Sequence, residues 1–194
     1  MSKLFYILLT SSFILQLTAC SVVPETESSI ASNTTRSETY ISAVAAMKSG
    51  KIRQARDLFV EAINIQPNLS DAYVNLGIIF IKNNSFDEAE NSFNQALTIN
   101  PNNIYALNQI GFLYRQQGEF SKAKASYLKA IDINSNYAYA HLNLGILYDL
   151  YLYDLESAIE QYKIYNELSK EKDTLVEKWI FDLERRHNKS VTKK

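Results

Sequence analysis

The sequence predicts an all-α protein in which about four helix–turn–helix repeats stack into a solenoid. Gly77, Gly111 and Gly145 lie 34 residues apart, and an aromatic residue follows each of them after three residues. The chain of 194 residues holds only five Gly and three Pro, which favours long helices. A period of 34 with small and aromatic residues at fixed offsets is typical of stacked helical pairs. Such pairs bury their apolar faces only against their neighbours.

Composition excludes several classes of protein. Hydrophobic residues make up 46% of the chain, which is too many for a disordered protein, and the net charge of −1 gives no bulk attraction to nucleic acid. Cys20 is the only cysteine, so an internal disulfide or a cysteine-based metal site is excluded. We therefore expect no metal, no nucleic-acid partner and no small-molecule substrate.

Residues 1–19 are predicted to be an export signal. Lys3 supplies a positive start, and the mainly apolar stretch from Leu4 to Leu17 is too short to span a bilayer comfortably. The stretch ends in Leu17-Thr18-Ala19-Cys20, in which small residues precede a possible cleavage point. An ordinary signal peptide with Cys20 as a bystander is the alternative.

These four residues resemble the lipobox of bacterial lipoproteins. The resemblance implies cleavage before Cys20 and a covalent lipid on it, which would be the only bound group of the protein. Ser21 in place of Asp implies the outer membrane, with the protein facing the periplasm. Residues 20–36 then form the lipidated cysteine and a flexible tether, because they are rich in Ser, Thr and Glu and have no helical period.

The bounds of the repeat units are obtained by assigning each of the three glycines to the eighth position of its unit. The units span 70–103, 104–137 and 138–172, and a first unit at 36–69 has Ala43 in place of the glycine. The second half of the units agrees in register, with alanines at positions 20 and 27 and an aromatic ring at position 24. These are Ala55, Ala89 and Ala123; Phe59, Phe93 and Tyr127; and Ala62, Ala96 and Ala130.

This pattern resembles the tetratricopeptide repeat (TPR) family over residues 36–172. The match is strong in the two middle units and weaker in the first and the fourth, where Tyr165 replaces an alanine. The resemblance implies a right-handed superhelical solenoid whose first helix in each unit, helix A, lines a concave surface. We place the TPR domain at residues 37–187.

The end of the chain departs from the simple repeat. One residue is inserted in the turn Tyr151-Leu152-Tyr153-Asp154, as a tolerated loop or as an exposed tyrosine-rich contact for a partner. The apolar residues of 173–187 predict a capping helix: Val176, Trp179, Ile180 and Leu183. Residues 188–194 form a basic tail, either solvated or in contact with an anionic surface.

A binding groove is predicted on the concave face. The family commonly has Asn at position 9, whereas Ile78, Phe112 and Ile146 stand there in this chain. An apolar stripe edged by amides would suit an amphipathic helix or an extended apolar segment of a protein. The alternative is that helix packing already buries these side chains. The predicted groove residues are Val74, Asn75, Ile78, Tyr105, Asn108, Gln109, Phe112, Tyr139, Leu142, Asn143 and Ile146.

The sequence also disfavours two specific activities. The groove lacks the cations with which some TPR domains clamp a carboxylate terminus. No catalytic motif is present: His141 stands at a packing position and His187 lies near the end of the chain. The protein is therefore expected not to be an enzyme.

The resemblance implies a membrane-anchored adaptor that binds a protein or peptide partner of the bacterial cell envelope. Known TPR lipoproteins of this design serve pilus secretins or peptidoglycan enzymes, and small TPR proteins accompany TonB-type systems. The competing hypothesis is a structural tether or assembly protein that has no client groove.

Overall fold

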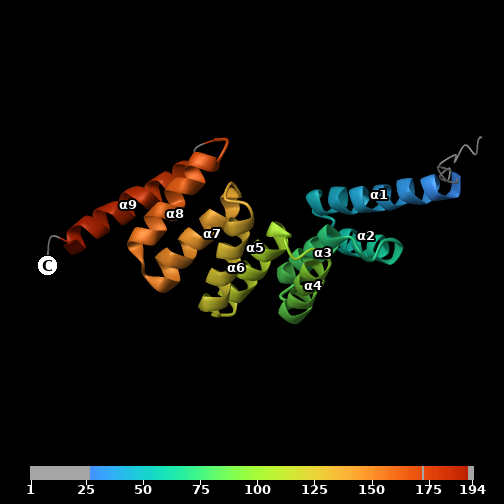
Figure 1. Ribbon diagram of the computed structural model, residues 1–194, viewed down its shortest axis with the longest axis horizontal. Coiled ribbons are helices and arrows are strands. Elements are labelled where there is room, and N and C mark those ends of the chain that lie inside the picture. The colour runs from blue at the N-terminus through green and yellow to red at the C-terminus, as the bar shows by residue number, and fades with distance from the viewer. Residues whose placement is uncertain (1–26, 172, 192–194) are drawn as a thin grey trace, which may run out of the picture.

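The computed structural model describes residues 27–171 and 173–191 of the chain. The predicted signal segment, Cys20 and the last three residues lie outside this part. Helices follow one another along the long axis of the molecule, from α1 at one end to α9 at the other (Figure 1). They are α1 (Glu27–Lys48), α2 (Ile52–Ile65), α3 (Ser70–Lys82), α4 (Phe86–Ile99), α5 (Ile104–Gln116), α6 (Phe120–Ile133), α7 (Ala138–Leu147), the π-helix η1 (Tyr148–Leu152), α8 (Leu155–Leu168) and α9 (Thr174–Val191).

The predicted all-α solenoid is confirmed. Helices α1, α3, α5 and α7 are the A helices, and each packs against the B helix that follows it. Each of α2, α4 and α6 also packs against the next A helix, while α3 contacts α5 and α5 contacts α7. Helices α3, α5 and α7 therefore form one layer, and each repeat is covered by its neighbour.

The core is built from small and aromatic residues that alternate along the array. The alanines at positions 20 and 27 are fully buried in the units where the sequence places them, as are the rings of Phe59, Phe93 and Tyr127. The repeat glycines lie directly against such rings. A Cβ added to Gly77 would come within 2.5 Å of Phe93, and one added to Gly145 within 2.7 Å of Tyr162. The glycines are therefore packing residues that let helices A and B approach closely.

The turns between helices A and B need a residue with left-handed backbone. Gly50 (φ 73°), Asn84 (φ 59°) and Gly118 (φ 79°) occupy this place in the first three units. Glycine and asparagine adopt positive φ at low cost, so the sequence suits the turn.

In the fourth unit, the turn between helices A and B contains one extra residue and has a different backbone conformation. Helix α7 continues into the π-helix η1, whose wider turn accommodates one more residue, and Tyr153 takes the left-handed conformation with φ 56°. Asp154 then caps α8, its carboxylate accepting a hydrogen bond from the Ser157 N–H at 3.1 Å. The inserted residue therefore changes only the turn, and the packing of α7 on α8 keeps the pattern of the other units.

Both ends of the array differ in extent from the predicted boundaries. Residues 27–36 are helical and belong to α1, although the sequence places them in a flexible tether. No Gly or Pro lies between Pro24 and Gly50, so nothing in this stretch breaks the helix. At the other end α9 extends past residue 187 to Val191.

Helix α9 covers the last apolar face of the array. Val176 and Leu183 are fully buried against α8, and Trp179 packs beside Tyr162 with 5.5 Å between the ring centroids. Within the described part of the chain, no helix is both long and apolar enough to cross a membrane.

Candidate functional site

The apolar residues at repeat position 9 lie along successive A helices. Ile78 on α3, Phe112 on α5 and Ile146 on α7 are each half-buried. Ile78 and Ile146 pack partly against the core, and the Arg115 guanidinium lies 5.2 Å from the centre of the Phe112 ring. Packing therefore covers part of each side chain and leaves part of it at the surface.

Positions 5 and 6 join neighbouring repeats by hydrogen bonds. Asn75 donates from Nδ2 to the Tyr40 hydroxyl at 3.2 Å, and Asn143 donates from Nδ2 to Asn108 Oδ1 at 2.9 Å. Each bond links position 6 of one unit with position 5 of the unit before it. These amides hold the A helices in register, so much of their hydrogen-bonding capacity is used within the protein.

Two predicted groove residues correspondingly offer almost no surface. Val74 is 4% exposed and Asn108 is 3% exposed. Both stand at position 5, where the next A helix packs over the side chain. Gln109, at position 6 of the third unit (104–137), is half-buried. Leu142, at position 5 of the fourth unit, packs partly against the core. Position 5 therefore belongs largely to the inter-repeat contact.

Two tyrosines at position 2 form a row with two tyrosines from other repeat positions. Tyr105 and Tyr139 are exposed, and Tyr137 lies between them with centroid distances of 5.4 Å and 6.2 Å. Tyr165 continues the row at 6.5 Å from Tyr139. Burial first, and then the neighbouring Tyr105 and Tyr139, raise the pKa of Tyr137 to about 12. Tyr137 is therefore uncharged at neutral pH, and the row forms an aromatic edge beside the A helices.

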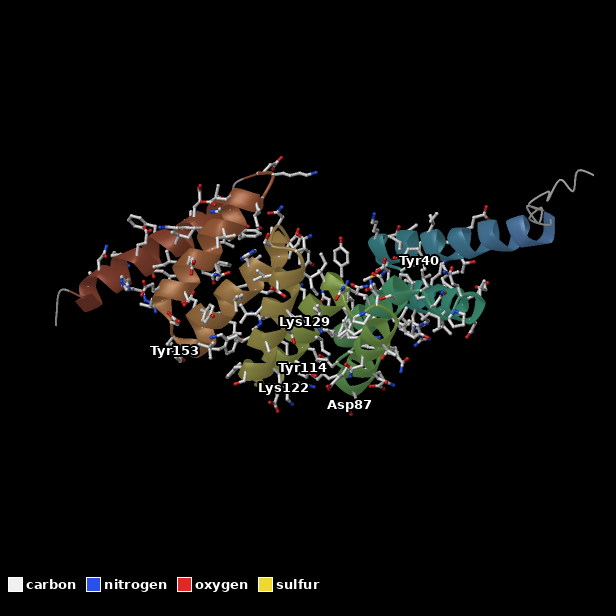
Figure 2. All side chains as sticks on the ribbon, viewed as in Figure 1. Tyr40, Asp87, Tyr114, Lys122, Lys129 and Tyr153 are labelled. Atoms are coloured by element: carbon white, nitrogen blue, oxygen red, sulfur yellow. The ribbon has the colours of Figure 1, made fainter. Side chains whose placement is uncertain are left out.

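A cavity of about 190 Å³ opens between α1, α3 and α5. Its lining contains five of the predicted groove residues, together with Tyr40 and Asp71, which the predicted groove omits: Tyr40, Asp71, Val74, Asn75, Ile78, Tyr105 and Gln109. Tyr40 lies where α1 approaches α3 (Figure 2). The structure thus brings the N-terminal half of the predicted groove together around one hollow.

The position-9 stripe is longer than predicted. Val44 precedes Ile78 by 34 residues and Phe181 follows Ile146 by 35, the inserted residue accounting for the difference. Val44 is half-buried on α1, whereas Phe181 is 71% exposed on α9. The same 34-residue step could have found both residues from the sequence, provided that the insertion was counted.

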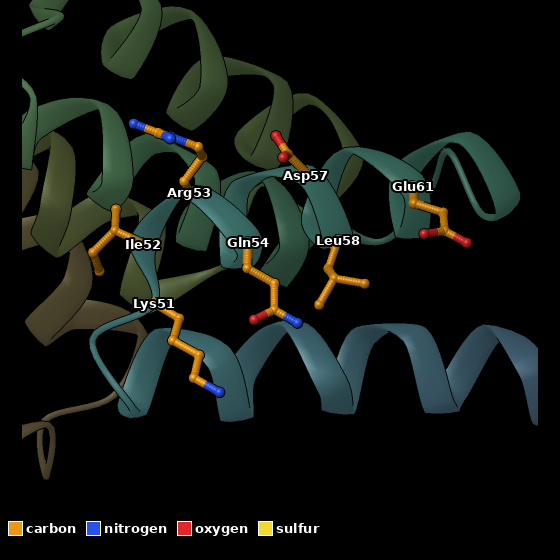
Figure 3. A pocket seen from close by; sticks show the side chains of 7 residues that line it. All are labelled: Lys51, Ile52, Arg53, Gln54, Asp57, Leu58 and Glu61. Carbon is orange, nitrogen blue, oxygen red and sulfur yellow. The ribbon is translucent and has the colours of Figure 1, made fainter.

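Other hollows are less suited to a specific partner. One of about 580 Å³ is lined only by Lys51 and residues of α2, with charges of both signs (Figure 3). Asp57 in this lining already pairs with Arg56 at 3.0 Å.

His141 has a structural role. His141 is buried, with Nδ1 2.8 Å from the Gln161 side-chain oxygen and Nε2 2.9 Å from the Ser135 carbonyl. The carbonyl accepts only from an Nε2–H, so the ring ties α7 to α8 and to the loop before α7. The described residues contain no group of three or more His, Cys, Asp or Glu side chains placed to hold a metal ion.

Comparison with known proteins supports the repeat assignment. Residues 70–103 and 92–125 match the tetratricopeptide repeat, and residues 111–149 match a TPR repeat. A search of curated protein sequences found no significant match.

Solved structures share the fold. One from the functional characterization of Pseudomonas aeruginosa pilF is 21% identical, with a TM-score of 0.74 over 83% of this chain and 72% of that chain. MamA 41-end from Desulfovibrio magneticus RS-1 is 20% identical, with a TM-score of 0.58 over 69% of this chain and 75% of that one. A double mutant of MamA RS-1 is 18% identical, with a TM-score of 0.65 over 81% and 87%.

At these identities the likeness concerns the fold. Together with the 34-residue period and the paired helices, it shows that the chain contains tetratricopeptide repeats arranged as a solenoid.

Proposed function

We propose that this protein is a non-catalytic adaptor that binds a protein partner along the concave face of its A helices. TPR arrays generally act as scaffolds for protein–protein contacts. The observation that carries the proposal is the apolar stripe at position 9, which continues from Val44 on α1 to the exposed Phe181 on α9. A solvated surface needs no such repetition of apolar residues, whereas an interface does.

The stripe suits an amphipathic helix or an extended apolar segment. Its three central members lie one per repeat on α3, α5 and α7, which contact one another in turn, so a partner crossing these helices would meet them in sequence. The exposed rings of Tyr105 and Tyr139 add an edge of the kind that recurs at protein interfaces.

We further propose that a lipid on Cys20 anchors the adaptor to the outer membrane, facing the periplasm. The motif Leu17-Thr18-Ala19-Cys20 and the preceding apolar stretch support this. The complex served would be a pilus secretin, a peptidoglycan enzyme or a TonB-type system of the envelope. Labelling with palmitate compares wild type with Cys20→Ala, and equal labelling of the two would exclude the anchor.

The groove is tested by a variant that combines Ile78→Asn, Phe112→Asn and Ile146→Asn. Recovery of the partner from envelope extract should fall strongly, while circular dichroism reports whether the helices persist. Because these side chains are half-buried, Phe181→Asn serves as a second variant on an exposed residue. The matched control carries Val60→Asn and Leu128→Asn, which change exposed apolar residues of the B helices. Unchanged recovery with both groove variants would exclude the groove.

A second candidate is a tether or assembly protein that acts through its rim. Leu150, Leu152 and Tyr153 are all exposed at the π-helical turn, and Tyr153 lies at the lower edge of the molecule in Figure 2. Exposed apolar residues at a strained turn are a feature of contact sites. If Leu150→Asn with Tyr153→Asn abolishes partner recovery and the groove variants do not, this candidate replaces the first.

A further inference from the structure

The cavity of about 190 Å³ between α1, α3 and α5, which we call the Asp71 cavity, contains an acidic side chain, whereas farther along the groove the basic Arg115 lies beside Phe112. Of its seven lining residues, Asp71 alone carries a charge. Among the described residues, no Lys, Arg or His forms an ion pair with Asp71. The cavity therefore presents one exposed carboxylate, in the first turn of α3, that pairs with no cation of the described residues.

The Asp71 carboxylate is held in place by the neighbouring repeat. Asn103 donates from Nδ2 to Asp71 Oδ1 at 2.9 Å and to Ser70 Oγ at 2.8 Å. Asn103 itself is fixed, because its side-chain oxygen accepts from the backbone N–H groups of Tyr105 and Ala106 at 3.0 Å. A carboxylate positioned in this way loses little conformational freedom when it binds a cation.

The remaining lining suits the stem and the head of a cationic side chain. Val74 and Ile78 supply an apolar floor for methylene groups. Tyr40 accepts a hydrogen bond from Asn75, and the remaining lone pair of its hydroxyl oxygen can accept a second one from a cationic head group. Tyr105 brings an exposed aromatic ring, whose face attracts a cation.

The volume of the Asp71 cavity limits the size of the group that can occupy it. Pockets for drug-sized ligands measure roughly 300–1,000 Å³. The Asp71 cavity is smaller, so it has room for one side chain and not for a whole ligand.

We infer that the Asp71 cavity receives a Lys or Arg side chain of the protein that binds the concave groove. This inference rests on the proposed function and specifies its partner chemistry: a basic residue adjacent to apolar residues that meet the position-9 stripe. Charge complementarity carries the choice, since a negative cavity without a cation disfavours an acidic or carboxylate-terminated segment.

The test uses a random peptide library displayed on phage and the full chain as the immobilised target. Bound peptides should be enriched in Lys or Arg beside aliphatic or aromatic residues. One selected peptide is then synthesised with its basic residue and with Gln in that place, and both are measured against wild type and Asp71→Asn. Asparagine keeps the oxygen that accepts from Asn103, so the fold is preserved.

The expected result is a coupling between the two changes. Loss of either charge should weaken binding about tenfold, and loss of both should weaken it little further, because both changes remove the same contact. Asp87→Asn, an exposed change at the start of α4, is the matched control and should leave binding unchanged (Figure 2).

Two outcomes separate this inference from the proposed function. If selected peptides lack basic residues, or Asp71→Asn has no effect while the triple Asn variant abolishes binding, the cationic occupant is excluded and the groove stands. If the triple Asn variant and Phe181→Asn both bind the peptides unchanged, or if no peptide is bound, both proposals fail.

Discussion

The second and fourth repeats share the same close contact between helices A and B but connect these helices by different turns. In the second, Gly77 lies against Phe93 and Asn84 takes the left-handed turn; in the fourth, Gly145 lies against Tyr162 and Tyr153 takes that turn. The contact between helices A and B is the same in both, although the fourth contains one more residue. The comparison shows that the close approach of the paired helices is fixed and that the turn between them is free to vary.

The largest expected effect comes from breaking the shared contact. Gly77→Ala and Gly145→Ala would each place a methyl group within 2.8 Å of a fully buried ring. Overpacking costs roughly 1–3 kcal/mol, and the better helix propensity of alanine recovers about 1 kcal/mol of it. Because ring and helix backbone are both held in the core, we expect each variant to lose about 2 kcal/mol in denaturant unfolding. A loss confined to Gly77→Ala would show that the inserted residue loosens the fourth repeat.

A smaller effect of opposite sign is expected at the differing turn. Tyr153→Gly should raise the free energy of unfolding by about 1 kcal/mol, because a tyrosine with positive φ is strained and a glycine is not. The ring of Tyr153 is 77% exposed, so its removal costs little burial. Asn84→Gly in the second repeat is the control and should change stability by only a few tenths of a kcal/mol. A destabilised Tyr153→Gly variant would mean that the ring makes a contact the fold requires.

The smallest effect concerns the hydroxyl that distinguishes Tyr127 from Phe93 at the same repeat position. The Tyr127 hydroxyl is buried and, within the described part of the chain, makes no hydrogen bond of regular geometry, although the Arg115 guanidinium is near enough to lower its pKa. Tyr127→Phe should therefore leave stability unchanged or raise it by up to about 1 kcal/mol in thermal unfolding at neutral pH. A clear loss would indicate that the hydroxyl has a partner.

The same variant should change the response to alkali. Burial raises the pKa of Tyr127 to about 12, from 10.0. Since the unfolded chain ionises first, stability is retained below about pH 10 and falls as the pH rises toward 12. Burial also raises the pKa of Tyr162. Tyr127→Phe should therefore lessen the alkaline loss without removing it, as measured by the midpoint of urea unfolding between pH 9 and 12.

The repeat period predicts the fold well because the signal recurs. Gly77, Gly111 and Gly145 set the register, and their close approach to a ring is the physical reason for the spacing. The π-helical turn could not be foreseen: an inserted residue shows in the sequence, but how the backbone accommodates it depends on the packing of α7 on α8.

The candidate site was predicted less completely. Position 9 emerged from the sequence because its residues repeat, yet Val74 and Asn108 are buried by the neighbouring A helix, which no single repeat reveals. The contribution of Asp71 depends on Asn103, 32 residues away, and therefore on how two repeats meet.

The central claim is that a partner protein lies along the position-9 stripe, and site-specific photo-crosslinking tests it most directly. A photoreactive phenylalanine derivative is placed at Phe112 or Phe181, or at Leu128, which is exposed on α6. The groove account predicts an adduct of the same mass in the cell envelope from Phe112 and Phe181 and none from Leu128. An adduct from Leu128 alone would contradict it.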